Sequence, residues 1–243
     1  MAFVHGKGAV VLMDKYDLSA YHNDVGWTQE VDAAETTAFG ATDKAYIVGL
    51  GDGKVSASGL LDTTATIGGD VAYAALMKKA VNPVLLTSPV ALALGGVALM
   101  AQSVATSYEI NGKVDGVVET KAEFQVDDGV DHGIVLAAAK SVATATTTNE
   151  TSQDGAASTA NGGVGQVHVT ANAHNAGTVI KVQHSTDNSA WVDLVTFTTV
   201  ATTVTTAERI EVAAGTTIRR YLRATSTTSG TGAVVYTVAF ARR

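Results

Sequence analysis

Residues 49–54, Gly-Leu-Gly-Asp-Gly-Lys, are the first candidate for chemistry because they are similar to a phosphate-binding loop. In that loop a glycine opens the motif, and a Ser or Thr directly after the lysine holds magnesium. Val48 and Val55 occupy those two positions here. We therefore interpret the segment as a turn that leads into a strand.

Two groups of polar residues could in principle bind a metal ion. His168 and His174 lack the helical or cysteine-assisted spacing of a zinc site, so we expect ordinary polar positions for both. Asp127, Asp128 and Asp131 crowd a predicted turn at DDGVDHG and could hold a stray cation. They do not follow the calcium-loop pattern, and we favour a solvated hairpin.

The chain contains no cysteine, which excludes disulfides, thiolate metal sites and cysteine nucleophiles. No nucleophile elbow occurs, and no set of Ser, His and Asp stands out from the background. The sequence therefore gives no support for catalysis, and we expect neither an enzyme nor a cofactor.

The elements that would position these residues are mostly strands. Aromatic residues make up only 6% of the chain and charged residues 16%, while Ala, Val, Thr and Gly dominate, a mixture that suits strands in thin layers. Residues 116–127 alternate apolar and polar side chains with a period of two, which predicts a half-buried strand. A short helix is predicted over VAYAALMKKAV after Asp70, ending before Pro83. The predicted fold class is therefore mainly β with one α-helix.

Charge divides the chain into two parts. Residues 1–140 contain nine Lys, no Arg and 17 acidic residues, for a net charge of −8, whereas residues 166–243 contain all six Arg and have a net charge of +3. Residues 143–163 contain almost only Ala, Thr, Ser, Asn and Gly, and such a segment recovers little free energy by burial. We predict a first domain over residues 1–142, a flexible linker over 143–165 and a second domain over 166–243.

The second predicted domain contains several short strands separated by turns, which favours a small β-sandwich. Trp191 with Arg219, Arg220 and Arg223 could form a binding surface on it. A buried Trp and solvated Arg side chains are the alternative interpretation.

Three blocks of the first domain resemble the tail tube (major tail) proteins of long-tailed, non-contractile bacteriophages. The blocks are GKGAVVLMDKYDLSAYHNDVGW at 6–27, VDAAETTAFGATDKAYIVGLGDGKVSASGLLD at 31–62 and TSYEINGKVDGVVETKAEFQVDDGVDHGIVL at 106–136. The middle block is the most specific, with acidic and Thr residues before Phe39 and Gly40 and then Gly-Asp-Gly ahead of a strand.

The resemblance implies a tail-tube β-sandwich or barrel with one helix, whose copies form hexameric rings stacked into the conduit for genome ejection. The implied partners are copies of the chain itself and the tape measure, tail terminator and distal tail proteins, with transient, non-specific passage of DNA. The implied location is the virion tail, assembled in the host cytoplasm. By position, residues 31–53 would form the loop that contacts the next ring. The residues assigned to this stacking loop are Val31, Asp32, Glu35, Thr36, Thr37, Phe39, Tyr46, Leu50 and Asp52.

An acidic lumen would let DNA slide, because a basic one would hold the phosphates by counterion release. Glu109, Asp115, Glu119 and Glu123 are the candidate lumen-facing acids, and a solvated outer face is the alternative position for them. The second domain would decorate the tube exterior, so we expect a chain without residues 145–243 to polymerise still.

A virion adhesion or carbohydrate-binding protein that acts through residues 166–243 is the alternative function. No membrane insertion is expected, because Pro83, Pro89 and several polar residues interrupt the uncharged stretch between residues 80 and 108. Residues 9–13 are also too short for the apolar region of a signal peptide.

Overall fold

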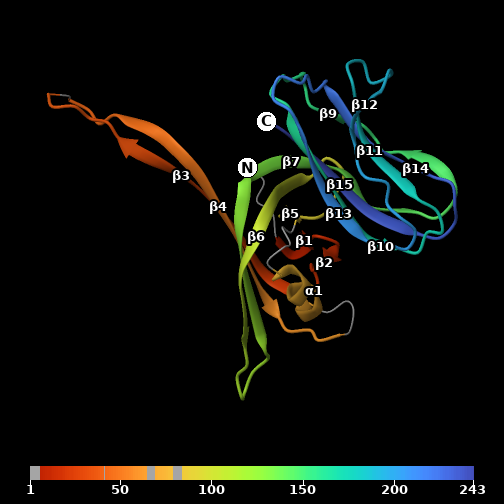
Figure 1. Cartoon of the computed structure of the whole chain (residues 1–243), viewed down its shortest axis with the longest axis horizontal. Coiled ribbons are helices and arrows are strands. Elements are labelled where there is room, and N and C mark those ends of the chain that lie inside the picture. The colour runs from red at the N-terminus through yellow and green to blue at the C-terminus, as the bar shows by residue number, and fades with distance from the viewer. Residues whose placement is uncertain (1–5, 41, 65–68, 79–83) are drawn as a thin grey trace. The chain divides into compact units, whose positions relative to one another are not determined.

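The computed structural model describes residues 6–40, 42–64, 69–78 and 84–243. These residues form antiparallel strands and one α-helix, which confirms the predicted fold class. They belong to two compact units (Figure 1). Unit 1 consists of Met1–Ala20, Val84–Met100 and Asp131–Arg243, and unit 2 consists of Tyr21–Pro83 and Ala101–Val130.

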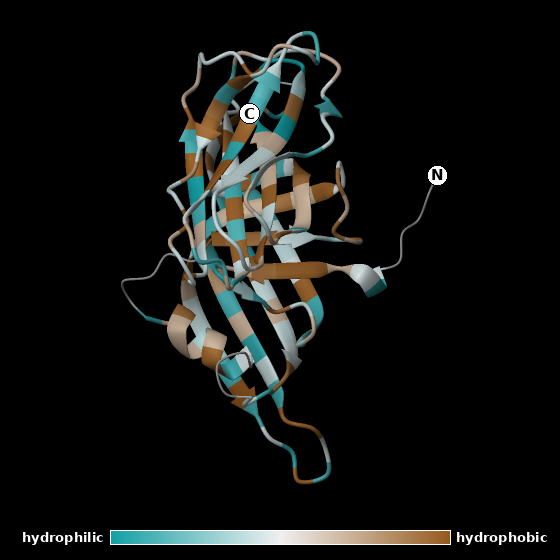
Figure 2. Ribbon diagram, turned by 90° about the vertical axis from the view of Figure 1, so that its right-hand side faces the viewer, coloured by the Kyte–Doolittle hydropathy of each residue, from teal (hydrophilic) through white to brown (hydrophobic). Residues whose placement is uncertain are grey.

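Unit 2 is a sheet with a helix on one face, and its strand order is β3-β4-β7-β6. Its elements are β3 (His22–Glu35), β4 (Tyr46–Leu60), α1 (Gly69–Leu76) and the unit 2 parts of β6 (Val97–Asn111) and β7 (Glu119–Val142). Hydrophobic and hydrophilic residues alternate along the strands (Figure 2), so one face of each strand can be buried.

Helix α1 covers the apolar face of this sheet through Tyr73. The Tyr73 ring stacks on Tyr108 of β6 with the ring centroids 4.7 Å apart, and it lies 6.4 Å from the Phe124 ring of β7. Its hydroxyl is 2.8 Å from Nε2 of His22 on β3. The helix ends at Leu76, earlier than predicted, and the predicted stop at Pro83 lies outside the described residues.

Unit 1 contains two sheets. The first has the order β13-β10-β15-β7-β6-β5-β1-β2, and β13 also lies against β5, so the sheet curls. The elements not yet given are η1 (Gly6–Gly8), β1 (Val10–Met13), β2 (Tyr16–Asp17), β5 (Val84–Ser88), β10 (Gly163–Asn172), β13 (Thr206–Val212) and β15 (Val234–Arg242). One face of this sheet carries a small core with Leu12, Leu86, Met100 and Val135.

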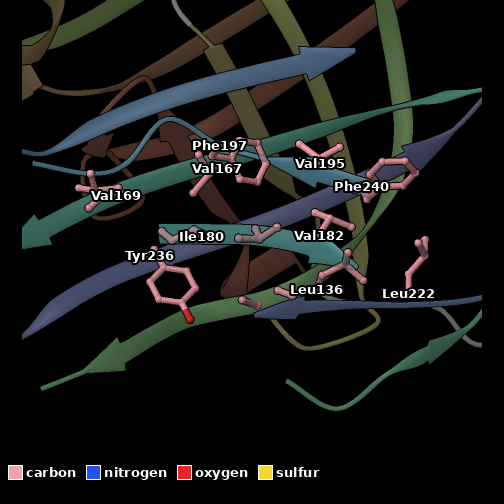
Figure 3. Close-up of a cluster of buried hydrophobic side chains, with 14 of the residues drawn as sticks. Leu136, Val167, Val169, Ile180, Val182, Val195, Phe197, Leu222, Tyr236 and Phe240 are labelled. Atoms are coloured by element: carbon pink, nitrogen blue, oxygen red, sulfur yellow. The ribbon is translucent and has the colours of Figure 1, made fainter. Parts of the chain in front are cut away.

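The second sheet of unit 1 has the order β12-β11-β14-β8, and β9 also pairs with β14. Its strands are β8 (Thr146–Asn149), β9 (Gln153–Asp154), β11 (Thr178–Ser185), β12 (Val192–Thr196) and β14 (Tyr221–Thr228). It packs against the opposite face of the first sheet through a core that includes Phe197, Tyr236 and Phe240 (Figure 3). The predicted β-sandwich is therefore present.

The predicted boundaries of the second domain differ from the structure. Leu136 and Val142 of β7 belong to the same core as Phe240, and β15 pairs with β7 from Val234↔Val142 to Phe240↔Ile134. Residues 166–243 thus share a sheet and a core with residues before the predicted linker. Charge composition could not reveal this pairing, because it does not depend on which strands are neighbours.

The predicted flexible linker over 143–165 contains strands instead. Strand β8 pairs with β14 from Thr225↔Asn149 to Thr228↔Thr146, and β9 pairs with the other end of β14. Thr225 donates a hydrogen bond to the carbonyl of Thr148. Strands β8 and β9 have no large apolar side chain, but backbone and hydroxyl hydrogen bonds are enough to attach them to an existing sheet.

The turn predicted at residues 127–133 lies within strand β7. Asp128 and Gly129 take positive φ angles of 63° and 81° there, which bends the strand without ending it. Asp131 is buried and accepts hydrogen bonds from Arg209 and Arg243, at 2.8 and 2.9 Å. The expected hairpin is therefore absent, and Asp131 is not solvated because arginines remote in the sequence pair with it, whereas Asp127 and Asp128 are exposed as expected.

Candidate assembly interface

The segment predicted as a stacking loop is an extended β-hairpin. We call residues 28–52, the distal parts of β3 and β4 with their turn, the arm. Its strands pair from Val31↔Gly51 to Glu35↔Tyr46, and the turn is closed by Thr36, whose N–H donates to the carbonyl of Ala45 at 2.7 Å. In Figure 1 the arm extends away from the rest of its unit.

A bulge in the arm explains one of its glycines. The register shifts between Val31 and Ala33, opposite residues 49 and 50. A Cβ atom at Gly49 would lie only 2.9 Å from the Cβ of Asp32. Gly49 therefore permits close strand pairing at this point.

Every described residue of the arm is exposed, on both faces of the hairpin. Six large apolar side chains are among them: Val31 (56% exposed), Phe39 (110%), Tyr46 (56%), Ile47 (58%), Val48 (82%) and Leu50 (83%). A two-stranded hairpin is only marginally stable by itself, and clustered exposed apolar groups mark interaction sites. The arm therefore has the properties of a surface that packs against another protein surface.

All nine residues assigned to the stacking loop lie on the arm. Asp52 lies at its base, where it accepts a hydrogen bond from the Gln125 side chain. Ile47 and Val48 lie within the predicted range 31–53 but were not among its named candidates, since the sequence does not distinguish them from core residues. Only their exposure in the structure distinguishes them.

The four candidate lumen acids are exposed in unit 2, and lysines accompany three of them. Lys121 contacts Glu123 at 2.7 Å, and Lys113 contacts Glu119 at 3.8 Å. The hydrogen bond between Lys121 and Glu123 lowers the pKa of Glu123 and raises the pKa of Lys121, and the charge of Glu109 adds to the rise. Asp115 lies in the β6–β7 turn. This surface alternates acids with lysines and is not uniformly negative.

An open depression of about 470 Å³ lies over the same sheet. Its lining residues are Thr28, Lys54, Val55, Ser56, Thr106, Glu123, Phe124 and Gln125. Lys54 pairs across the strands with Gln125, and Ser56 with Glu123. The lining is mostly polar, in keeping with a solvated sheet face.

The two units differ in net charge. By sequence, unit 2 has six Lys and 14 acidic residues, for a net charge of −8. Unit 1 has four Lys, six Arg and nine acidic residues, for a net charge of +1. The asymmetry seen in the sequence thus follows the spatial units, which interleave along the chain.

The structure brings together two of the four residues proposed as an outer binding surface. The guanidinium of Arg223 lies 4.1 Å from the centre of the half-buried Trp191 ring. Arg220 instead forms a bidentate pair with Asp154, which lowers the pKa of that carboxyl to about 2. The backbone N–H of Arg219 donates to His184.

A chain of side chains continues from Arg223 over β11 and β12. Gln183 accepts from Arg223 at 2.8 and 3.0 Å and donates to Asp193 at 2.8 Å. Lys181 donates to Asp193 at 2.7 Å. These contacts hold the side chains of Gln183, Asp193 and Lys181 in place, and each side chain can form further hydrogen bonds.

The two histidines considered as metal ligands are both buried, and each has its own hydrogen-bond partners. His168 donates from Nδ1 to the carbonyl of Asp14 at 2.7 Å, and burial lowers its pKa to about 4. His174 lies within 3.0 Å of the Thr228 hydroxyl and of the Ala176 carbonyl. Within the described ranges, no three His, Asp or Glu side chains are placed to hold a metal ion. The described helix, with eight residues, is also too short to cross a membrane.

No family model and no curated protein matches this chain. Solved structures do. The chain is similar to a protein of the native gene transfer agent particle virion (TM-score 0.42, 14% identity, 54% of this chain and 98% of the other). It is also similar to the SPP1 tail tube protein (0.44, 12%, 54% and 78%) and to the SPP1 Dit protein (0.39, 11%, 96% and 98%). Because all three TM-scores lie below 0.5, these likenesses assign neither family nor function.

Proposed function

We propose that this protein is a structural subunit of a phage tail tube, which forms stacked hexameric rings around the path of genome ejection. The observation that carries the proposal is that unit 2 leaves apolar side chains and a strand edge uncovered. Its arm exposes apolar side chains on both faces, and its edge strand β3 has no outer neighbour among the described residues. The proposal includes contacts with the tape measure, tail terminator and distal tail proteins, after assembly in the host cytoplasm.

The edges of the unit 2 sheet support self-association. Among the described residues, β3 pairs only with β4, so its outer edge has no partner strand over 14 residues. Unpaired edges are templates for pairing with another chain. Joining the edges of neighbouring copies in a closed ring would satisfy their backbone groups without open-ended aggregation.

The charge of unit 2 supports a conduit for DNA. In the proposed ring, the exposed face with Glu109, Asp115, Glu119 and Glu123 would line the lumen. Lys113 and Lys121 would moderate its negative potential, while the net charge of −8 per unit 2 keeps the sign repulsive. Phosphates within about 10 Å would feel this repulsion at ordinary ionic strength.

Assembly of purified protein tests the proposal. Negative-stain electron microscopy should show rings or tubes of uniform width, and a Phe39→Asp/Val48→Asp variant should give none at the same concentration. Thr186→Asp, an exposed turn position in unit 1, is the matched control and should assemble normally. Dispersed monomers of the wild-type chain at high concentration would contradict the proposal.

Saccharide binding by unit 1 is a second candidate function, favoured by the arrangement at Trp191. Aromatic rings contact the apolar faces of sugars, and fixed side chains such as Gln183 and Asp193 match hydroxyl groups that both donate and accept. This surface would decorate the tube or, as the alternative, act in a virion adhesion protein.

Trp fluorescence tests this second function, because the chain has only two Trp residues, Trp27 and Trp191. In a Trp27→Phe background, titration with N-acetylglucosamine, galactose and rhamnose should change the emission of Trp191 with saturation. Adding Arg223→Ala should weaken the response at least tenfold, whereas Arg220→Ala should leave it unchanged. An unchanged emission with all three sugars would contradict saccharide recognition of this kind.

A further inference from the structure

The exposed large apolar residues of unit 2 fall mainly into two groups. One group is the arm. The other contains Leu60 (44% exposed), Ile110 (50%), Val114 (109%) and Val117 (66%), and we call these four residues the distal patch. Val104, on β6, is the remaining one among the described residues of the unit.

The distal patch is local. Leu60 ends β4 and pairs with Glu119, the first residue of β7. The next residue, Leu61, donates its N–H to the carbonyl of Val118 at 3.0 Å. Ile110 lies near the end of β6, and Val114 and Val117 lie in the turn between β6 and β7. All four residues therefore belong to one end of the sheet.

The arm and the distal patch lie at opposite ends of this sheet. Strand β4 runs from Tyr46 beside the arm turn to Leu60 in the distal patch. Its 15 residues span roughly 50 Å at about 3.3 Å per residue. Figure 1 shows the arm and the β6–β7 turn pointing in different directions from unit 2. The arm therefore cannot cover the distal patch of its own chain.

We propose that the distal patch of one copy receives the arm of the next copy. This inference rests on the proposed function and names the partner surface of the arm. Two different apolar surfaces at opposite ends make a heterologous contact, and repetition of such a contact builds an open head-to-tail stack. A contact between two arms would instead be isologous and would end at a dimer.

Cross-linking between single-cysteine variants tests the pairing without background, because the native chain has no cysteine. Phe39→Cys and Val114→Cys are purified separately, mixed and treated with a short bis-maleimide. Cross-linked dimers are expected in the mixture and not in either variant alone. The matched control mixes Phe39→Cys with Thr186→Cys, and this pair should stay monomeric on a denaturing gel.

A second set of variants keeps the test independent of cross-linker reach. Val114→Asp/Val117→Asp should lower the yield of assembled protein at least tenfold, with an unchanged circular dichroism spectrum. Val192→Asp, at an exposed valine of unit 1 (46%), is the control and should assemble as the wild type does.

The outcomes separate this inference from the proposed function. Wild-type tubes that give no link between positions 39 and 114 would overturn the pairing and leave the tube function intact. Links between arms in the Phe39→Cys variant alone would also overturn it. Links between positions 39 and 114 without tubes would support the pairing and contradict the tube.

Discussion

Unit 1 and unit 2 are both built from antiparallel strands, but they differ in how much of the surface of those strands is buried. Unit 1 buries both faces of its first sheet, against a second sheet on one side and against its own curled strands on the other. Unit 2 covers one face of its sheet with a single helix and leaves the arm and the distal patch exposed. The difference shows that unit 1 buries its own apolar surface, whereas unit 2 leaves apolar surface uncovered, as the proposed assembly requires.

Truncation after Thr144 should have the largest effect. It removes every partner that Leu136 and Val142 have in the main core except the nearby residues of β7 itself. A loss comparable with the whole stability of a domain, about 5–15 kcal/mol, is expected for unit 1. Limited proteolysis and near-ultraviolet circular dichroism would measure it.

The matched control for the truncation shortens unit 2 instead, with residues 36–45 replaced by an Asn-Gly turn. This chain should keep a protease-resistant unit 1. A truncated chain that still folds cooperatively and polymerises would restore the independent first domain that charge composition suggested.

Acid should destabilise unit 1 through His168. Burial lowers the pKa of this imidazole from 6.5 to about 4, so between these values the unfolded chain binds a proton that the folded chain does not. Stability should therefore fall as the pH drops from about 6.5 to 4, by about 3 kcal/mol for this group. Urea unfolding of the wild type and of His168→Gln at pH 7, 5.5 and 4.5 measures it.

The slope with pH should be shallower in His168→Gln than in the wild type. Burial also lowers the pKa values of His22 and His184, so both proteins keep the slope that these groups cause. His132→Gln, at an exposed position, serves as the control and should behave as the wild type. Equal slopes in all three proteins would refute the role of His168.

The smallest effect on the fold is expected for Leu50→Ala in the arm. Its side chain is 83% exposed, so truncation should change the free energy of unfolding by less than about 0.5 kcal/mol. The same substitution at Leu222, which is 1% exposed in unit 1, should cost about 2–5 kcal/mol. Chemical denaturation compares the two, and a large loss at Leu50 would mean that the arm packs within its own subunit.

The sequence predicted individual strands better than it predicted which strands pair with each other. The two-residue period over 116–127 identified the strand that carries Phe124. It did not reveal that β7 continues through Asp128 and Gly129 into unit 1. The Asp- and Gly-rich residues 127–133 were wrongly predicted to end a strand at a turn, because β7 continues beyond them and pairs with β15.

For the candidate site, too, the sequence predicted the segment but not its geometry or contacts. The bounds of the arm could be predicted from the family resemblance, whereas its hairpin geometry and the exposure of Ile47 and Val48 could not. Of the residues proposed as an outer surface, only Trp191 and Arg223 meet, since Arg220 is held by Asp154. Which side chains meet across strands depends on the register, and single-chain composition does not encode it.

By itself, the sequence determined the β-rich composition, the absence of cysteine chemistry and the excess of acidic residues, because these are properties of residue types and short-range periodicity. The tertiary structure alone decided that the Thr-rich segment joins a sheet, that Asp131 is buried beside arginines and that the arm remains uncovered. Each of these depends on segments remote in the sequence, and burial is set by what lies on the other side of a strand.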